Sequence, residues 1–363
     1  MRTVEVPLGD RTYRIQVERD LIQKLGLTCK KLGLGRRCAV ISDSNVSRIL
    51  GLSARQSLEQ AGFDPVAIAF PAGEKSKSLK VVASCYDALA RHRLERKSFI
   101  VALGGGVVGD LAGFVAATYL RGIPFVQIPT TLLAQVDSSV GGKVGVNLPA
   151  GKNLVGAFYQ PRAVLCDLTT LDTLPEREFR AGLAEVIKYG IIYDAKFFAM
   201  LERNLEKVLA RDASSLAMIV SRCCEIKAEV VTQDETETGL RAILNFGHTI
   251  GHALEAISSY GKYLHGEAIS IGQVAAARLS TRLRGLPVSD SERIKALFER
   301  AGLPVAVRLN AAQREKVFAA MRLDKKVSAG EVKFVLAREI GKVEFGMDVS
   351  RSEIESVLTE IAA

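Results

Sequence analysis

The chain has 363 residues, of which 48% are hydrophobic and 25% are charged, the proportions of a folded globular protein. Its formal net charge is +9, but the Lys and Arg residues are dispersed among acidic ones, which favours small anionic ligands over nucleic acid. The length predicts two domains rather than one.

The six cysteines show no metal-binding spacing and are typical of a reducing cytoplasm. The N-terminus lacks the apolar region of a signal peptide. The apolar stretch 99–120 contains five glycines and a central Asp110, and a central Asp costs about 2.5–3.5 kcal/mol in a membrane. We therefore predict a cytoplasmic protein without a membrane segment.

Strand and helix patterns alternate through the first half of the chain. Residues 2–8 and 11–17 alternate polar and apolar side chains around Gly-Asp, which predicts a β-hairpin. Further strands are predicted at 38–43, 66–70, 99–103 and 125–129, with helices at 44–61, 78–93 and 107–119. This alternation predicts a doubly wound, mostly parallel, Rossmann-like α/β sheet, whose ligands bind at the carboxyl ends of its strands.

Helical patterns dominate the chain from about Thr173 onward. They predict helices at 176–190, 194–202, 213–233, 245–258, 266–284, 289–301 and 311–321, followed by a hairpin at 332–337 and 342–345 and a last helix. The predicted organisation is thus an α/β domain over residues 1–174 and a mainly α-helical domain over residues 175–363.

Three of the four histidines lie close together in the second half. His248 and His252 are four residues apart and would share one face of a helix, and His265 follows shortly after. Imidazole is the commonest metal ligand among side chains, and catalytic zinc sites use three protein ligands. Polar helix residues with ordinary hydrogen bonds are the alternative. We favour a metal site with a third ligand, a carboxylate, from elsewhere.

The helix predicted at 176–190 offers that carboxylate. Its face is apolar except for Glu185 and Lys188, and buried charges require a partner or a metal. Glu185 is therefore the candidate third ligand. A simple ion pair between the two side chains, which are three residues apart, is the alternative.

Several segments at the predicted strand ends suit a nucleotide. Residues 104–110, G-G-G-V-V-G-D, match G-x-G-x-x-G between a strand and a helix, although a tight turn would use the same glycines. Asp43, the segment 73–78 and the pair Thr130-Thr131 follow other strands, where they would bind a nucleotide or cap helices. Together they predict a nucleotide-binding edge of the sheet.

Residues 134–153 contain Lys143 and Lys152, each preceded by glycine, in a segment with few other charges. We interpret this segment as a glycine-rich functional loop, because lysine is a compact donor for phosphate and carboxylate. A solvated surface loop, the alternative, would carry more charge.

With these motifs assembled, the chain resembles the 3-dehydroquinate synthases, members of the sugar-phosphate cyclase group. The motifs that carry the resemblance lie between residues 43 and 326 and include G-G-G-V-V-G-D-L-A-G-F, P-T-T-L-L-A-Q-V-D-S-S-V-G-G-K-V-G-V-N, G-K-N, A-E-V-I-K-Y-G, L-N-F-G-H-T-I-G-H and H-G-E-A. The resemblance implies conversion of 3-deoxy-D-arabino-heptulosonate 7-phosphate to 3-dehydroquinate and phosphate, the second step of the shikimate pathway. It implies catalytic NAD+ and a divalent metal, zinc or cobalt. We also expect a homodimer.

The resemblance also implies roles for individual residues. The metal ligands would be Glu185, His248 and His265, with His252 near the substrate, whereas spacing alone nominates His252 as a ligand. The implied substrate-binding and catalytic residues are Arg121, Asp137, Lys143, Lys152, Asn153, Lys188, Lys227, Arg241, Asn245 and His252. The implied NAD+-binding residues are Asp43, Asn45, Gly73, Glu74, Lys77, Gly105, Gly106, Val107, Val108, Gly109, Asp110, Thr130, Thr131, Lys143, Lys152, Thr170, Leu171, Asp172 and Thr173. Either Lys325 or Lys326 would reach the substrate phosphate.

Three alternatives stay open at this point. They are another sugar-phosphate cyclase such as a 2-deoxy-scyllo-inosose synthase, a metal-dependent polyol dehydrogenase related to glycerol dehydrogenase, and a nucleotide-binding regulator. The lysine-rich segment with Lys227 and Arg241 favours a substrate that carries both phosphate and carboxylate. A regulator would have no use for Glu185 and the histidines together.

Overall fold

The computed structural model describes residues 1–258, 262–323, 327–328 and 331–362, which form two compact units. Unit 1 comprises Met1–Leu174 and Leu216–Thr236, and unit 2 comprises Pro175–Ser215 and Glu237–Ala363. One crossing lies at the expected boundary, Leu174. A single boundary was expected, but residues 216–236 also belong to unit 1. Most of these residues lie in helix α7 (Ala213–Gln233), whose Cys224 Sγ lies 3.3 Å from the carbonyl oxygen of Gln135.

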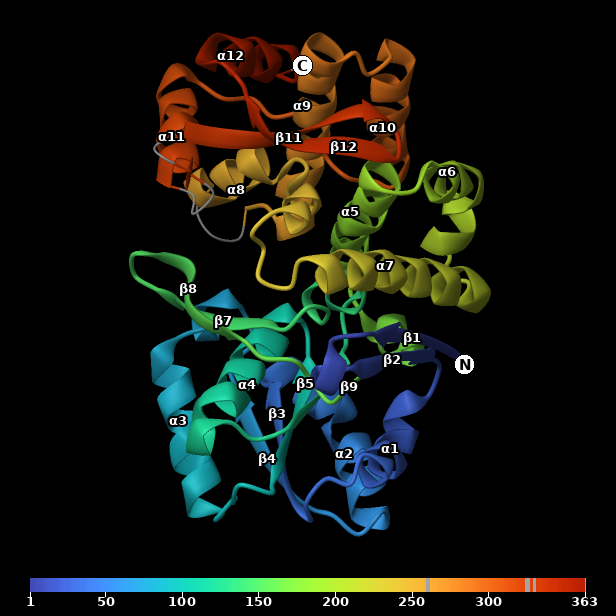
Figure 1. Cartoon of the computed structure of the whole chain (residues 1–363), viewed down its shortest axis with the longest axis vertical. Helices are drawn as coiled ribbons and strands as arrows, with labels where there is room; N and C mark the ends of the chain where they lie inside the picture. Colours follow the sequence, from blue (N-terminus) through green and yellow to red (C-terminus); the bar gives the residue numbers. More distant parts are fainter. Residues whose placement is uncertain (259–261, 324–326, 329–330, 363) are drawn as a thin grey trace. The chain divides into compact units, whose positions relative to one another are not determined.

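Unit 1 is built on a seven-stranded sheet with the order β1-β2-β9-β6-β5-β3-β4 (Figure 1). The hairpin strands β1 and β2 are antiparallel, and every pairing from β2 to β4 is parallel. The strands are β1 Arg2–Val6, β2 Tyr13–Glu18, β3 Arg37–Asp43, β4 Asp64–Phe70, β5 Phe99–Gly104, β6 Phe125–Pro129 and β9 Ala163–Asp167. The predicted hairpin and mostly parallel sheet are therefore confirmed, whereas β9, a short buried strand, was not predicted.

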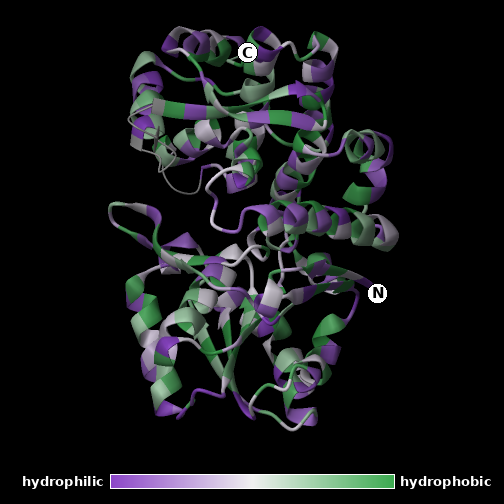
Figure 2. Ribbon diagram, viewed as in Figure 1, coloured by the Kyte–Doolittle hydropathy of each residue, from purple (hydrophilic) through white to green (hydrophobic). Residues whose placement is uncertain are grey.

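Helices cover both faces of this sheet, as a doubly wound fold requires. Val40 and Val101 pack into the core beneath α1 and α2, and Ile41 and Ala102 pack into the core beneath α3 and α4. The strands are accordingly rich in hydrophobic residues in Figure 2. The helices are α1 Leu25–Lys31, α2 Ser44–Gln60, α3 Leu79–Arg91 and α4 Gly106–Thr118. With both faces covered, the carboxyl ends of the parallel strands are left for the loops that follow them.

The segment predicted as a glycine-rich loop is largely a hairpin. Strands β7 (Lys143–Leu148) and β8 (Gly151–Phe158) pair antiparallel in a separate two-stranded sheet. The loop interpretation of residues 143–153 was therefore wrong. Val144, Gly145 and Val146 are buried in succession in β7, so its burial does not follow the two-residue period that would have indicated a strand.

Unit 2 is mainly helical, as predicted, and its helix α5 (Glu176–Ile192) is almost wholly buried from Phe179 to Ile192. Its other elements are α6 Ala195–Leu209, α8 His248–Ile257, α9 His265–Arg284, α10 Val288–Arg300, α11 Ala311–Leu323, β10 Val327–Ser328, β11 Glu331–Glu339, β12 Lys342–Asp348 and α12 Arg351–Glu360. The predicted helix 245–258 begins only at His248, after a 3-10 turn over Leu240–Asn245. None of the helices in the described ranges combines the length and the apolar composition that a membrane crossing requires.

Candidate active site

The three histidines of the second half form one cluster in unit 2. His248 and His252 lie one turn apart on α8, and His265 is the first residue of α9. One ring nitrogen from each histidine lies within 4.8 Å of the others, a separation that a shared metal ion can bridge. The three histidines that the sequence analysis grouped therefore lie together, and their role as metal ligands stays a prediction.

Glu185 of α5 faces this cluster and is fully buried. Its Oε1 lies 3.6 Å from His248 Nε2 and 3.8 Å from His265 Nε2. Both separations are too long for hydrogen bonds, and Oε1 has no hydrogen-bond partner among the residues that the structure describes. A buried carboxylate oxygen without a hydrogen bond is costly unless a cation supplies the missing interaction. The arrangement therefore fits a divalent metal.

The two histidines that face Glu185 are oriented through their other ring nitrogens. His248 Nδ1 lies 3.1 Å from the carbonyl oxygen of Phe246, and His265 Nδ1 lies 3.2 Å from Glu255 Oε2. Each acceptor favours a proton on Nδ1 and leaves the lone pair on Nε2, directed at Glu185. Sequence reasoning missed Glu255, although it follows His248 by two helical turns and so shares its face of α8.

Lys188 contacts the other carboxylate oxygen of Glu185, and both side chains are almost inaccessible to solvent. The predicted ion pair is thus present beside the histidine cluster, so the two interpretations of this helix do not exclude each other. Because the Lys188 ammonium contacts Oε2 of Glu185, Oε1 is the oxygen that faces the histidines. This arrangement places a positive charge next to the candidate metal site.

A second ion pair fixes the start of α9. Arg177 donates two hydrogen bonds, of 2.7 and 2.8 Å, to the carboxylate of Glu267, which also accepts the backbone N–H of Leu264 at 2.8 Å. A Cβ on Gly266 would lie 1.9 Å from the carbonyl oxygen of Ala181, so only glycine permits this approach of α9 to α5. These contacts account for Gly266 and Glu267 of the motif H-G-E-A. Sequence reasoning noted Glu267 but not its partner.

In unit 1 the glycine turn lies between β5 and α4, where the pattern predicted it. Gly105 occupies the N-cap of α4 without a side-chain cap, so the first amides of the helix stay available to a phosphate. A Cβ added to Gly106 would lie 3.1 Å from Ser138 Oγ, so the Ser138 hydroxyl is close to this turn. Ser138 Oγ and the buried Thr130 Oγ1 lack hydrogen-bond partners within the described ranges. Two unsatisfied hydroxyls near an uncapped helix start fit a bound polar ligand.

Lys77 joins the loops at this edge of the sheet. Its Nζ donates to Asp110 Oδ2 and to Asn153 Oδ1, both at 2.5 Å, so the segment 73–78, helix α4 and strand β8 meet at one ammonium. Asn147 donates to Glu74 Oε1 at 2.8 Å and ties β7 to the same segment. Burial raises the pKa of Asp110, while the adjacent Lys77 acts in the opposite direction.

Other predicted nucleotide residues serve as caps or structural links. Asp43 accepts the backbone N–H groups of Asn45 and Val46, at 2.8 and 3.0 Å, and so caps α2. Thr131 accepts the N–H of Ala134 at 3.1 Å. Residues 168–173 form a 3-10 turn after β9, and its Asp172 pairs with Arg19 at 2.5 Å. These contacts position the backbone at the strand ends, and a ligand role for the side chains stays a prediction.

The residues predicted to bind substrate are described in both units. In unit 1, Lys227 of α7 donates to the carbonyl oxygen of Asp137 at 2.6 Å and to its Oδ1 at 2.9 Å. Arg121 has a positive φ of 68° at the end of the 3-10 turn Tyr119–Arg121, which follows α4. In unit 2, Arg241 is buried, and Asn245 donates to Glu237 at 3.2 Å. Lys143 is exposed, Lys152 is partly buried, and Lys325 and Lys326 lie outside the described residues.

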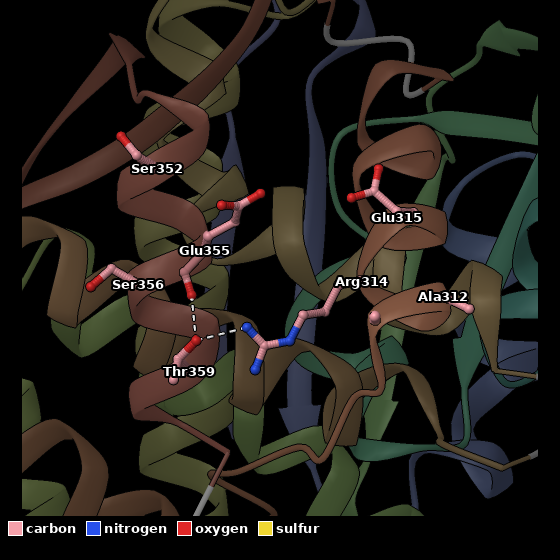
Figure 3. A pocket seen from close by; sticks show the side chains of 8 residues that line it. Ala312, Arg314, Glu315, Ser352, Glu355, Ser356 and Thr359 are labelled. Carbon is pink, nitrogen blue, oxygen red and sulfur yellow. Dashed lines mark hydrogen bonds between the residues drawn. The ribbon is translucent and has the colours of Figure 1, made fainter.

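A pocket of about 660 Å³ between α11 and α12 is a poor alternative site. In Figure 3, Arg314 reaches across it to Thr359, and the donor–acceptor distance is 2.7 Å. Glu315 and Glu355 both pair with Arg351. The pocket therefore offers polar groups that are already engaged, and none of the predicted motifs lines it.

The histidine cluster and the glycine turn fall within two matched families. Residues 67–181 match the 3-dehydroquinate synthase N-terminal family, and residues 182–327 match the 3-dehydroquinate synthase C-terminal family. The chain belongs to the 3-dehydroquinate synthase family. Glu185 and the three histidines lie in the C-terminal match, and the glycine turn lies in the N-terminal one.

Similarity to individual members of the family extends over nearly the whole chain. A 3-dehydroquinate synthase from Desulforamulus reducens is 49% identical over 360 residues, which cover 99% of this chain and 100% of the relative. One from Geobacter metallireducens is 52% identical over 341 residues, or 94% of each chain. The similarity therefore covers nearly the whole of this chain and of both relatives.

Solved structures of related cyclases share the fold. A 2-deoxy-scyllo-inosose synthase with carbaglucose-6-phosphate, NAD+ and Co2+ has a TM-score of 0.91 and 28% identity, covering 99% of this chain and 100% of that one. A 2-epi-5-epi-valiolone synthase from Streptomyces hygroscopicus with NAD+ and Zn2+ has a TM-score of 0.88 and 28% identity, covering 96% of both. A butanol dehydrogenase from Thermotoga maritima, 17% identical with a TM-score of 0.68 and 96% of both chains covered, shares the fold alone.

Proposed function

We propose that the chain is an NAD+- and metal-dependent 3-dehydroquinate synthase that converts 3-deoxy-D-arabino-heptulosonate 7-phosphate into 3-dehydroquinate and phosphate. Relatives of that name at about half identity over the full chain support the reaction. The observation that carries it is the buried Glu185 carboxylate facing the histidine cluster, because this donor set suits zinc or cobalt.

Glu185, His248 and His265 are the proposed metal ligands. The support is that both Nε2 atoms face the same carboxylate oxygen while both Nδ1 atoms have acceptors of their own. His252 belongs to the same cluster, so its proposed place beside the substrate rests on the resemblance. If NAD+ and the metal were both bound, the nicotinamide would supply hydride transfer at the C5 carbinol of the substrate. The metal would supply Lewis acidity at the carbinol oxygen.

The residues of unit 1 are proposed to bind the dinucleotide at the glycine turn. The uncapped start of α4 suits a pyrophosphate, and the hydroxyls of Thr130 and Ser138 offer hydrogen bonds that the described residues leave unused. Lys77 holds Asp110 and Asn153 in place around this edge. Here the chain contributes binding and orientation rather than a proton transfer.

The lysines and arginines named above are proposed to hold the phosphate and the carboxylate of the substrate. Lys227 is fixed by Asp137, and Lys188 by Glu185, so each ammonium is oriented before an anion binds. A preorganised cation stabilises the charge that develops on a departing phosphate, because the side chain need not reorient during the reaction. Arg241 and Asn245 are further proposed donors to the substrate.

We further propose a cytoplasmic homodimer. All six cysteines are free thiols, which fits a reducing compartment. Leu154 and Phe158 are exposed on β8, whose one strand neighbour within the described ranges is β7, and exposed apolar side chains favour association with another chain.

Phosphate release tests the proposed function. Purified protein with Zn2+ or Co2+ should release phosphate from the heptulosonate phosphate only when NAD+ is present, without net NADH accumulation, and a chelator should abolish release. Release from glucose 6-phosphate instead would indicate the reaction of a 2-deoxy-scyllo-inosose synthase. Net oxidation of a polyol would indicate a dehydrogenase.

We predict that Lys152→Ala weakens the use of the phosphorylated substrate. One charge-assisted hydrogen bond contributes about 1.5–3 kcal/mol, so kcat/KM should fall roughly 10- to 100-fold. The dissociation constant of NAD+ should change far less than kcat/KM for the substrate. Lys75→Ala is the matched control, because Lys75 is an exposed lysine of the neighbouring segment. Weaker NAD+ binding with unchanged substrate use would move Lys152 to the cofactor site.

A further inference from the structure

We propose that Glu255 is a positioning residue that holds His265 in the tautomer required for metal binding. The inference rests on the proposed metal site and adds to it a residue outside the ligand set. Glu255 Oε2 lies 3.2 Å from His265 Nδ1, and His265 Nε2 lies 3.8 Å from Glu185 Oε1. An imidazole that donates from Nδ1 keeps its lone pair on Nε2, the nitrogen that faces Glu185.

The place of Glu255 in the fold supports this role. Glu255 follows His248 by seven residues and His252 by three, so α8 presents all three side chains on one face. Its side chain is 17% exposed, so water screens the interaction with His265 only in part. One helix thus carries a proposed ligand and the group that orients a ligand from the next helix.

His265 requires such a partner more than His248 does. The side chain of His248 is 10% exposed, and its Nδ1 faces the Phe246 carbonyl two residues away, which the backbone itself fixes. The side chain of His265 is 30% exposed at the first position of α9, so packing constrains its ring less. The Arg177–Glu267 ion pair and the bond from Leu264 N–H to Glu267 hold the backbone at this helix start. A carboxylate on Nδ1 fixes the ring and raises the basicity of the opposite nitrogen.

Metal affinity measures this effect directly. Metal-free protein is titrated with Co2+ against a chelator, and the visible absorption of the bound ion reports its coordination. Loss of an orienting partner typically weakens binding 10- to 100-fold, so we expect about that change for Glu255→Ala. Glu255→Gln keeps an acceptor oxygen and should recover part of the affinity. Glu202→Gln is the control, because Glu202 is a similarly shielded carboxylate paired with Arg293, on a different helix.

Two further measurements separate positioning from a general effect of charge. In metal-free wild type, nitrogen chemical shifts of the His265 ring should report a proton on Nδ1, and Glu255→Ala should shift the ring toward the other tautomer. In a His265→Ala background, Glu255→Ala should cause no further loss of Co2+ affinity.

The outcomes distinguish this inference from the proposed function. If wild type binds no Co2+, the proposed metal site fails. If wild type binds Co2+ and Glu255→Ala binds it within twofold of wild type, only the role of Glu255 is overturned. An additive loss in the double variant would also overturn it, because the carboxylate would then act by its charge and not through His265.

Discussion

His248→Ala should lose its bound metal and nearly all turnover while the fold persists. A Lewis acid contributes several kcal/mol to stabilising charge at the reacting oxygen, and about 4 kcal/mol corresponds to roughly a thousandfold loss of kcat. The fold should persist because His248 is the first residue of α8, a position where alanine continues the helix. Metal content by mass spectrometry and phosphate release would be measured on the same preparation.

His92→Ala is the matched control for that variant. His92 is the fourth histidine of the chain, is exposed and ends α3 in unit 1, so metal content and turnover should stay at the wild-type level. His252→Ala is a second comparison. Because His252 is not in the proposed ligand set, this variant should retain its metal but turn over more slowly. Full metal occupancy in His248→Ala would overturn the assignment of His248 as a ligand.

The sequence predicts which side chains of the candidate site lie together better than it predicts the role of each. The three histidines and Glu185 were nominated from spacing and from polarity within an apolar helix, because both patterns are local. His252 could not be separated from His248 in this way, since residues four apart share a helix face. The distinction requires the acceptors of each Nδ1, and one of these, Glu255, belongs to a helix that does not contain His265.

The fold shows the same limit. The parallel sheet was predictable because its buried strands are continuous hydrophobic runs, whereas the hairpin of β7 and β8 was mistaken for a loop because of its glycines and lysines. Asn147 and Asn153 in that hairpin contact Glu74 and Lys77, about 75 residues earlier, and such long-range partners leave no local signal. The local sequence of helix α7 likewise does not indicate which of the two units the helix packs in.

Lys77→Met should be the most destabilising of the substitutions considered for unit 1. It would leave the Asp110 carboxylate buried without its ammonium, and breaking a buried ion pair costs about 3–5 kcal/mol. Because the side chain of Asp110 is 19% exposed, we expect about 3 kcal/mol, at the lower end. Hydrogen exchange of peptides from α4 and β8 would report the loss within unit 1, in protein without NAD+ or substrate.

Two variants test the cause of that loss. Adding Asp110→Asn to Lys77→Met removes the unpaired charge and should restore more than half of the lost stability. Lys24→Met is the control, because Lys24 pairs with Glu18 on the surface at 2.6 Å, where solvent screens the pair, and its loss should destabilise far less. Equal effects of Lys77→Met and Lys24→Met would contradict a buried, structural role for Lys77.

The pH dependence of the Lys77→Met variant follows from the same carboxylate. Burial raises the pKa of Asp110, and Lys77 lowers it, so removing Lys77 should raise the pKa further. The folded state then holds a proton that the unfolded state releases above the ordinary Asp pKa of about 3.9, and stability must fall as the pH rises between the two values. The stability deficit of Lys77→Met relative to wild type should therefore be small near pH 4 and grow as the pH rises above it. A deficit that is independent of pH would mean that lost packing of the lysine stem, rather than the unpaired carboxylate, destabilises the variant.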